Sequence, residues 1–168
     1  LKHNIPVLQP TNLKSPEFLT TLKSYNANLQ IVVAFRMLPE AVWAMPSIGT
    51  FNLHASLLPQ YRGAAPINWA IINGEQETGV STFFLKHEID TGSIIFQEKE
   101  PILEKDTVGT LYERLMKKGA NLVLKTVQAI EAGNYPSVPQ QDNVDIKHAP
   151  KIFKETCELK WDQPAAQV

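Results

Sequence analysis

Three things are scarce in this sequence, and each scarcity argues against a class of protein. A single cysteine, Cys157, leaves no partner for an internal disulfide. No apolar run approaches the roughly 18 residues that suggest a membrane-spanning helix. The formal net charge of −1 gives no basic field over the whole chain, so phosphate contacts must come from a local patch or from segments outside the sequence. These absences favour a cytosolic enzyme in which Cys157 is an inert thiol.

What is present is ordinary globular material. Of the 168 residues, 43% are hydrophobic and 20% are charged, which is enough apolar material for one core. The chain opens at Leu1 rather than Met, and it closes in the polar residues 161–168. We therefore expect both ends to be cut from a longer protein.

Apolar spacing and cap residues predict an α/β fold. A continuous apolar run at residues 29–35 is typical of a strand buried on both faces, as in a parallel sheet. Ser15 predicts a helix start, whereas Gly74 and Gly133 predict helix ends. With residues 5–8 as a first strand, the order is strand, helix, strand, helix, strand, helix. The other expected elements are helices 16–25, 39–44, 66–73 and 107–132, and strands 29–35, 48–54, 78–85 and 93–97.

Two polar residues lie at the end of an apolar strand. Along residues 48–54 the side chains alternate, so Asn52 and His54 share the face opposite Leu53. Ligands bind beyond the carboxyl ends of strands in open α/β sheets, and Asn52 and His54 therefore occupy the expected place for catalytic groups. The polar segment between the two later strands is the expected active loop, and it contains Asp90.

Four short blocks of sequence carry a resemblance to a known family. They are Asn52-Leu53-His54-Ala55-Ser56-Leu57-Leu58-Pro59, Tyr61-Arg62-Gly63-Ala64-Ala65-Pro66, Glu77-Thr78-Gly79-Val80 and Ile89-Asp90-Thr91-Gly92. With these blocks the sequence resembles the formyltetrahydrofolate-dependent formyltransferases over about residues 5–161, and most closely those that act on methionyl-tRNA. The resemblance implies a Rossmann-like, mostly parallel sheet of the formyltransferase fold without its first βαβ portion.

The resemblance also implies that Asn52, His54 and Asp90 form a catalytic trio, which transfers a formyl group from N10 of 10-formyltetrahydrofolate to an amine. Attack of the amine develops negative charge on the formyl oxygen, and Asn52 and His54 would hold that oxygen as hydrogen-bond donors. The amine must lose a proton and the folate nitrogen must gain one, which is the expected task of Asp90. Two interpretations of Asp90 stay open, because it could take the proton itself or anchor a water molecule and His54.

The family further implies a folate site around the segment 35–38 and the loop that leads to Asp90. From the residues alone, Met37 and Leu38 also fit core packing, Arg36 fits a surface salt bridge, and His87 fits a solvated loop. The expected folate-binding residues are Phe35, Arg36, Met37, Leu38, Ser56, Leu57, Leu58, Pro59, His87, Glu88 and Ile89.

Two other chemistries lack their motifs. Ser56 has no G-x-S-x-G elbow around it, so we expect its hydroxyl to bond the backbone of the turn and not to act as a nucleophile. His3, His87, His148 and Cys157 do not have the spacing of metal ligands, and we expect no metal site.

The resemblance implies an acceptor and a division into domains. The acceptor is initiator methionyl-tRNA, with most of its contacts expected from absent segments, and Arg62 either shapes the acceptor side or fastens its loop to a carboxylate. Residues 1–148 would be the partial catalytic domain, and residues 149–168 a linker toward an absent C-terminal barrel. A cytoplasmic location follows, whereas the oligomeric state stays open. The alternatives are an amino-sugar nucleotide N-formyltransferase, a 10-formyltetrahydrofolate hydrolase and, in another class, a folate-binding fragment without turnover.

Overall fold

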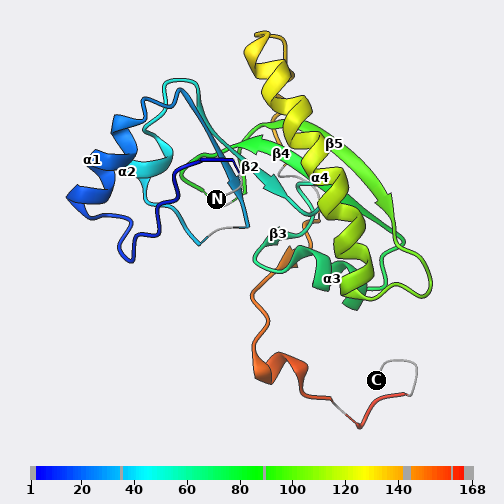
Figure 1. Cartoon of the computed structure of the whole chain (residues 1–168). Coiled ribbons are helices and arrows are strands. Elements are labelled where there is room, and N and C mark those ends of the chain that lie inside the picture. The colour runs from blue at the N-terminus through cyan, green and yellow to red at the C-terminus, as the bar shows by residue number, and fades with distance from the viewer. Residues whose placement is uncertain (1–2, 35, 89, 142–144, 160, 165–168) are drawn as a thin grey trace.

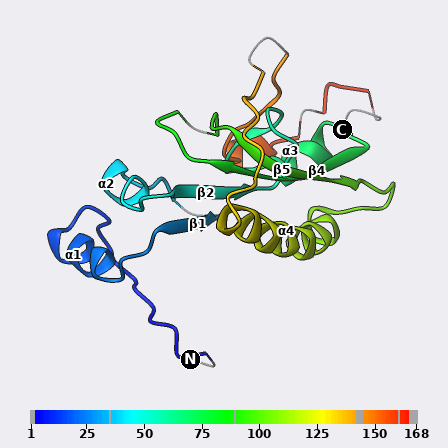
Figure 2. The same ribbon diagram turned by 90° about the horizontal axis from the view of Figure 1, so that it is seen from above.

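The computed structural model describes residues 3–34, 36–88, 90–141, 145–159 and 161–164. It has the predicted α/β fold, with a four-stranded sheet in the order β1-β2-β4-β5 (Figure 1). The strands of this sheet are Leu29–Val33, Gly49–His54, Glu77–Phe84 and Ile94–Pro101. The helices are α1, Pro16–Ser24; α2, Glu40–Trp43; α3, Pro66–Ile72; and α4, Val108–Glu131. The view in Figure 2 shows α4 lying along one face of the sheet.

Strand direction changes along the sheet. β1 runs parallel to β2, and the chain passes from one to the other through α2. β4 runs antiparallel to both β2 and β5. The described residues between β4 and β5 form no helix, so the chain turns back without a crossover and the pair is antiparallel. The parallel half is the expected Rossmann-like part, and the other half adds two antiparallel pairings that the apolar pattern of the strands did not specify.

The main core lies between the sheet and α4. The buried stripe predicted on this helix is present, at Leu111, Leu115, Leu122 and the partly buried Val123. It packs against Val80 of β4 and Leu53 of β2. Gly119 allows this close approach, because a Cβ atom there would lie 2.7 Å from a methyl carbon of Leu53. α4 therefore covers one face of the sheet, and a functional site can lie on the opposite face or at the ends of the strands.

The helix ends follow the predicted caps. Ser15 Oγ accepts the N–H of Phe18 at 3.3 Å and starts α1. Thr107 caps α4 in the same way. Gly74 and Gly133 adopt φ angles of 66° and 65° just after α3 and α4, a conformation that glycine adopts without strain.

Two expectations about the first strands are wrong. Residues 5–8 form no strand, and the side chains of Ile5 and Val7 are 65% and 58% exposed. β1 is not buried on both faces either, because Ile31 and Val33 are 44% and 54% exposed. β1 is the edge strand of the described sheet, and α4 packs mainly against β4 and β5, so the apolar run alone overstated the burial.

After α4 the chain returns to the sheet's polar face. A short strand β6, His148–Ala149, pairs in parallel with β3, Arg62–Gly63. The indole N–H of Trp69 then donates to the carbonyl of Pro150 at 2.8 Å. Strand pairing thus continues to Ala149, and the domain boundary at residue 148 stays a prediction.

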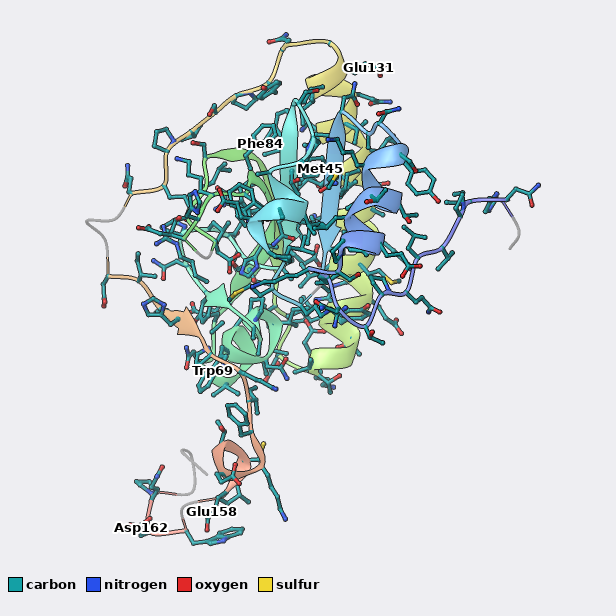
Figure 3. The ribbon with its side chains drawn as sticks, turned by 90° about the vertical axis from the view of Figure 1, so that its left-hand side faces the viewer. Met45, Trp69, Phe84, Glu131, Glu158 and Asp162 are labelled. Carbon is teal, nitrogen blue, oxygen red and sulfur yellow. The ribbon has the colours of Figure 1, made fainter. Side chains whose placement is uncertain are left out.

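Beyond Pro150 the chain extends away from the sheet. It contains a short 3₁₀ helix, η1, at Lys154–Cys157. Figure 3 shows Trp69 close to the point where this segment leaves the body, with Glu158 and Asp162 at its far end. The candidate site described below lies within the body and not in this extension.

Candidate active site

β2 carries the candidate catalytic residues on the sheet face opposite α4. Leu53 packs toward α4, so Asn52 and His54 point to the other face, as the alternation predicts. On the neighbouring strand β4, Ser81 lies opposite His54 and Phe83 lies opposite Asn52. The His54 ring meets the Phe83 ring edge-on, with centroids 6.5 Å apart. Polar groups and an aromatic ring therefore share this face at the carboxyl end of β2.

His54 has an oxygen atom near each of its ring nitrogens. Its side chain is buried, and Nε2 lies 2.8 Å from the carbonyl oxygen of Tyr61. Because a carbonyl oxygen can only accept, Nε2 must carry a hydrogen and donate it. Nδ1 then faces Asp90 Oδ2 at 3.9 Å. The fold thus places His54 next to Asp90, a contact that the sequence alone could not show.

Asp90 is buried in a left-handed backbone conformation, with φ at 55°. Its Oδ2 accepts the N–H of Gly63 at 3.0 Å. Gly63 has φ at 125°, and a Cβ atom there would lie 2.4 Å from the Ala149 carbonyl oxygen, so only glycine fits. The carboxylate is consequently fixed between the Gly63 N–H and the His54 ring.

Asn52 adds an amide on the same strand face. Its Oδ1 is buried and has no hydrogen-bond partner among the residues that the structure describes. A buried acceptor without a partner costs about 1–3 kcal/mol, and a bound ligand with an N–H or O–H group would remove that cost. The unsatisfied amide oxygen therefore fits a ligand-binding role for Asn52.

Hydrogen bonds anchor the turn that follows β2. Ser56 is fully buried, and its hydroxyl donates to a backbone carbonyl of the same turn at 2.6 Å, as expected. Leu58 is buried, and its N–H donates to Ser81 Oγ at 3.2 Å. Leu57 and Pro59 are partly buried. The buried side chains of Ser56 and Leu58 pack inward, and a folate-binding role for this turn stays a prediction.

The segment after β1 is more open. Met37 is 76% exposed and Leu38 is partly buried. Arg36 donates from its two terminal nitrogens to the backbone carbonyls of Pro10 and Thr11, at 2.7 and 3.3 Å. The exposure of Met37 argues against core packing for that side chain. Phe35, the first residue of the expected folate segment, lies outside the described residues.

Residues 86–88, in the loop before Asp90, are also exposed. His87 Nε2 lies 3.6 Å from Glu40 Oε1, and its ring meets Trp43 edge-on with centroids 5.3 Å apart. Glu88 is exposed, and Ile89 lies outside the described residues. These contacts do not test a folate-binding role for the loop, which stays a prediction.

Sequence reasoning missed a polar cluster behind the Tyr61 side chain. The phenol hydroxyl donates to Glu75 Oε1 at 2.5 Å and accepts from the Asn73 amide at 3.1 Å, while the Lys147 ammonium pairs with the same Glu75 carboxylate. The hydrogen bonds from Lys147 and then from Tyr61 lower the pKa of Glu75. Burial, followed by the bond to Glu75, raises the pKa of Tyr61. This cluster holds the loop whose carbonyl binds His54.

Gln140 is a second missed residue, and it reaches the site from the segment after α4. Its amide oxygen accepts from Arg62, and its amide nitrogen donates to the carbonyls of Asp90 and Gly92. The only signal near Gln140 in the sequence is an irregular, proline-containing stretch, which predicts a loop but no contact. Arg62 was expected either to shape the acceptor side or to fasten its loop to a carboxylate; it bonds this amide oxygen, and the carboxylate partner stays a prediction.

The arrangement can stabilise negative charge and move protons. His54 Nε2 is committed to Tyr61, so Nδ1 is the ring nitrogen that remains for a substrate or for Asp90. Asn52 offers an amide beside it, and Asp90 offers a carboxylate. In the part of the chain that the structure describes, no group of three His, Cys, Asp or Glu side chains is placed to hold a metal ion. These groups suit general acid–base chemistry on a carbonyl compound.

Residues 2–127, well over half of the chain, match the formyl transferase family. This chain belongs to that family. A relative named methionyl-tRNA formyltransferase, from Bacteroides fragilis, is 58% identical over 100% of this chain and 53% of its own length. A protein of the same name from Flavobacterium johnsoniae is 55% identical, again over 100% of this chain and 53% of its own. The chain therefore spans about half the length of these formyl transferase relatives.

Solved structures show the same fold. HypX from Aquifex aeolicus, in complex with tetrahydrofolic acid, has a TM-score of 0.75 at 23% identity and covers 92% of this chain and 27% of its own. The formyltransferase PseJ from Anoxybacillus kamchatkensis, solved with a sugar nucleotide and tetrahydrofolate, has a TM-score of 0.67 at 26% identity and covers 83% of this chain and 71% of its own. The α/β arrangement of the sheet and α4 is thus the formyl transferase fold. None of the helices within the described residues is both long and apolar enough to cross a membrane.

Proposed function

We propose that this chain carries the active site for transfer of a formyl group from 10-formyltetrahydrofolate to the α-amino group of initiator methionyl-tRNA. The observation that carries the proposal is the meeting of His54 and Asp90, 3.9 Å apart, beside Asn52 at the end of β2. Identity of 58% to a relative named methionyl-tRNA formyltransferase supports the acceptor.

In the proposed reaction, the amine nitrogen forms a bond to the formyl carbon, and the bond from that carbon to N10 of the folate breaks. After the first bond forms and before the second breaks, the formyl oxygen carries negative charge. The Asn52 amide and the His54 Nδ1 hydrogen would donate to this oxygen, and each good donor contributes about 3–4 kcal/mol in such a role. Because Nε2–H is bound to Tyr61, donation from Nδ1 requires the doubly protonated ring.

Asp90 would serve the proton transfers. The attacking amine loses one proton and N10 of the leaving folate gains one, so the net proton count is unchanged. The carboxylate faces His54 Nδ1 and is held by the Gly63 N–H, so it stabilises a cationic ring and can relay a proton directly or through water. Both interpretations of Asp90 fit its position.

The residues present fit a folate co-substrate. The buried Asn52 oxygen needs a hydrogen-bond donor, and the Phe83 ring lies next to the His54 ring on the same face. β1 is parallel to β2, so residues 36–38, which come shortly after β1, leave the sheet at the same edge as Asn52 and His54. We assign the pterin ring to this segment and to the loop that contains His87 and Glu88.

A tRNA acceptor also implies a domain organisation and a cellular location. We propose that residues 1–148 form part of the catalytic domain and that residues 149–168 lead toward a further domain that contributes most tRNA contacts. The site of action would be the cytoplasm, where initiator tRNA is used. The chain covers 53% of its relatives, so binding of tRNA is assigned to the whole protein.

A sugar nucleotide is the second candidate acceptor. The observation in its favour is the similarity in fold to PseJ, which was solved with a sugar nucleotide, at 26% identity. This likeness is weaker than the 55–58% identity to the relatives named for methionyl-tRNA. The catalytic trio would be the same, and only the acceptor contacts would differ.

One experiment separates these proposals. The protein at its natural full length is given 10-formyltetrahydrofolate with a labelled formyl group, and methionyl-tRNA and an amino-sugar nucleotide are offered in parallel. Label on methionyl-tRNA alone is the expected result. Label on the sugar would replace the acceptor, free labelled formate alone would indicate a hydrolase, and folate binding without any transfer would indicate a binding module.

A further inference from the structure

Gln140 bonds both sides of the candidate site with one side-chain amide. Its Oε1 accepts from Arg62 Nε at 3.0 Å and from Arg62 Nη2 at 2.7 Å. Its Nε2 donates to the carbonyl oxygen of Asp90 at 2.7 Å and to that of Gly92 at 2.8 Å. The partly buried amide of Gln140 therefore uses both of its polar atoms, each in two hydrogen bonds.

The two backbone carbonyls that Gln140 binds belong to the loop that presents Asp90. Asp90 has φ at 55°, a conformation that residues other than glycine rarely adopt. Such a conformation persists when the surrounding structure holds it. The paired bonds from Nε2 hold the peptide groups of Asp90 and Gly92, and so they set the direction in which the Asp90 side chain leaves the backbone.

The other side of Gln140 holds the strand that receives the Asp90 carboxylate. Arg62 precedes Gly63 in β3, and the Gly63 N–H donates to Asp90 Oδ2 at 3.0 Å. Gln140 therefore connects the backbone at Asp90 with the strand that binds the Asp90 side chain. These bonds close a ring around the carboxylate, next to His54 Nδ1 at 3.9 Å.

We infer that Gln140 is a positioning residue that places the Asp90 carboxylate against His54. This inference rests on the proposed function of the trio. Gln140 lies outside residues 2–127, the part that matches the formyl transferase family, so the segment after α4 contributes directly to the order of the active site. Gln140 acts through Asp90 and need not touch substrate.

A change of the Gln140 amide to a carboxylate can separate two roles, holding the Asp90 loop and anchoring Arg62. Gln140→Glu keeps an oxygen for the Arg62 guanidinium and strengthens that pair. It also replaces the Nε2 donor by a carboxylate oxygen, which repels the carbonyls of Asp90 and Gly92. If Gln140 only anchored Arg62, Gln140→Glu would be active, whereas a role in holding the Asp90 loop makes this variant as defective as Gln140→Ala.

The test compares formyl transfer by Gln140→Ala and Gln140→Glu with the matched controls Gln141→Ala and Gln141→Glu, in the protein at its natural full length. Gln141 is the adjacent, exposed glutamine. We expect kcat to fall about 10- to 100-fold in both Gln140 variants, because a displacement of about 1 Å can cost 10²-fold. We expect KM for 10-formyltetrahydrofolate to change by less than about threefold, since the loss concerns the chemical step.

A double-mutant cycle shows whether the effect passes through Asp90. In an Asp90→Ala background, Gln140→Ala should cause almost no further loss in single-turnover transfer. An equal loss in both backgrounds, or normal transfer by Gln140→Glu, would overturn the inference. If Gln140→Ala does not fold, the double-mutant cycle is measured with Gln140→Glu, which has nearly the same size as the parent residue.

A second readout does not depend on the acceptor. The NMR chemical shift of the Gly63 N–H reports its bond to the Asp90 carboxylate, and it should move in both Gln140 variants but not in the Gln141 variants. An unchanged shift would contradict the positioning role. A parent protein that transfers no formyl group to any acceptor would instead refute the proposed function, so the two failures can be told apart.

Discussion

His54 donates its Nε2–H to the carbonyl oxygen of Tyr61 at 2.8 Å and thereby turns Nδ1 toward Asp90 Oδ2, 3.9 Å away. The Tyr61 carbonyl fixes which nitrogen keeps its hydrogen in the neutral ring. Any hydrogen that His54 gives to the formyl oxygen must then come from Nδ1. The Asp90 carboxylate faces that same nitrogen, so in the proposed mechanism the two side chains act on the substrate together.

This geometry predicts the tautomer of His54. In protein labelled with ¹⁵N at histidine, the neutral His54 ring should carry its hydrogen on Nε2, because the carbonyl of Tyr61 accepts it. The measurement is a two-bond ¹⁵N–¹H correlation spectrum at a pH where the ring is neutral. The exposed His87 serves as an internal comparison, since its ring has no such carbonyl bond described. A spectrum with the hydrogen on Nδ1 of neutral His54 would contradict the arrangement.

The Tyr61 loop should make the stability depend on pH at both ends of the scale. Glu75 has a pKa below its ordinary value of 4.5, so it stabilises the fold above that pH, and this contribution is lost as the pH falls through its folded pKa. Lys147 and Tyr61 have raised pKa values, so they stabilise the fold below about pH 10, and this is lost as the pH rises through their folded values.

The variant Glu75→Gln tests this dependence. We expect it to lower Tm by about 1–3 °C at neutral pH, because a partly exposed ion pair contributes little to stability. The difference from the parent should shrink below about pH 4 and above about pH 11. Glu131→Gln, at the exposed end of α4, is the control and should leave Tm unchanged. A difference that is constant with pH would refute the assignment.

Arg114 should be the main electrostatic link between α4 and β5. It donates to Glu100 at 2.7 Å and to Asp106 at 2.5 Å, and both carboxyl groups have pKa values lowered first by this hydrogen bond. Arg114→Met should lower Tm by a few degrees at pH 7 and by less at pH 3, because the stability from the lowered pKa values of Glu100 and Asp106 is lost progressively as the pH falls below their ordinary values of 4.5 and 3.8. Lys117→Met, an exposed neighbour, is the control. Equal losses at the two pH values would exclude an ionic link.

The parts of the fold that could be predicted depend on local chemistry. Ser15 begins α1, and Gly74 and Gly133 follow the ends of α3 and α4, because a hydroxyl cap and a left-handed glycine act over a few residues. The alternation in β2 placed Asn52 and His54 on one face, because side-chain direction in a strand is also local.

The parts that could not be predicted depend on contacts across the chain. The exposure of Ile31 follows from which strand α4 covers, and an apolar run cannot tell that. The bonds of Gln140 and Lys147 join residues separated by several elements, and a loop sequence carries no periodic signal for such pairs. Asp90 itself was found through the resemblance, since its position beside His54 needs the whole fold.

The most direct measurement of the central claim is the single-turnover rate of formyl transfer from 10-formyltetrahydrofolate to methionyl-tRNA by the parent, His54→Ala and Asp90→Ala. His3→Ala and Asp162→Ala, at exposed positions away from the trio, are the matched controls. We predict that both trio variants lose at least about 100-fold in rate while the controls keep the parent rate. Near-normal transfer by His54→Ala or Asp90→Ala, in correctly folded protein, would contradict the account.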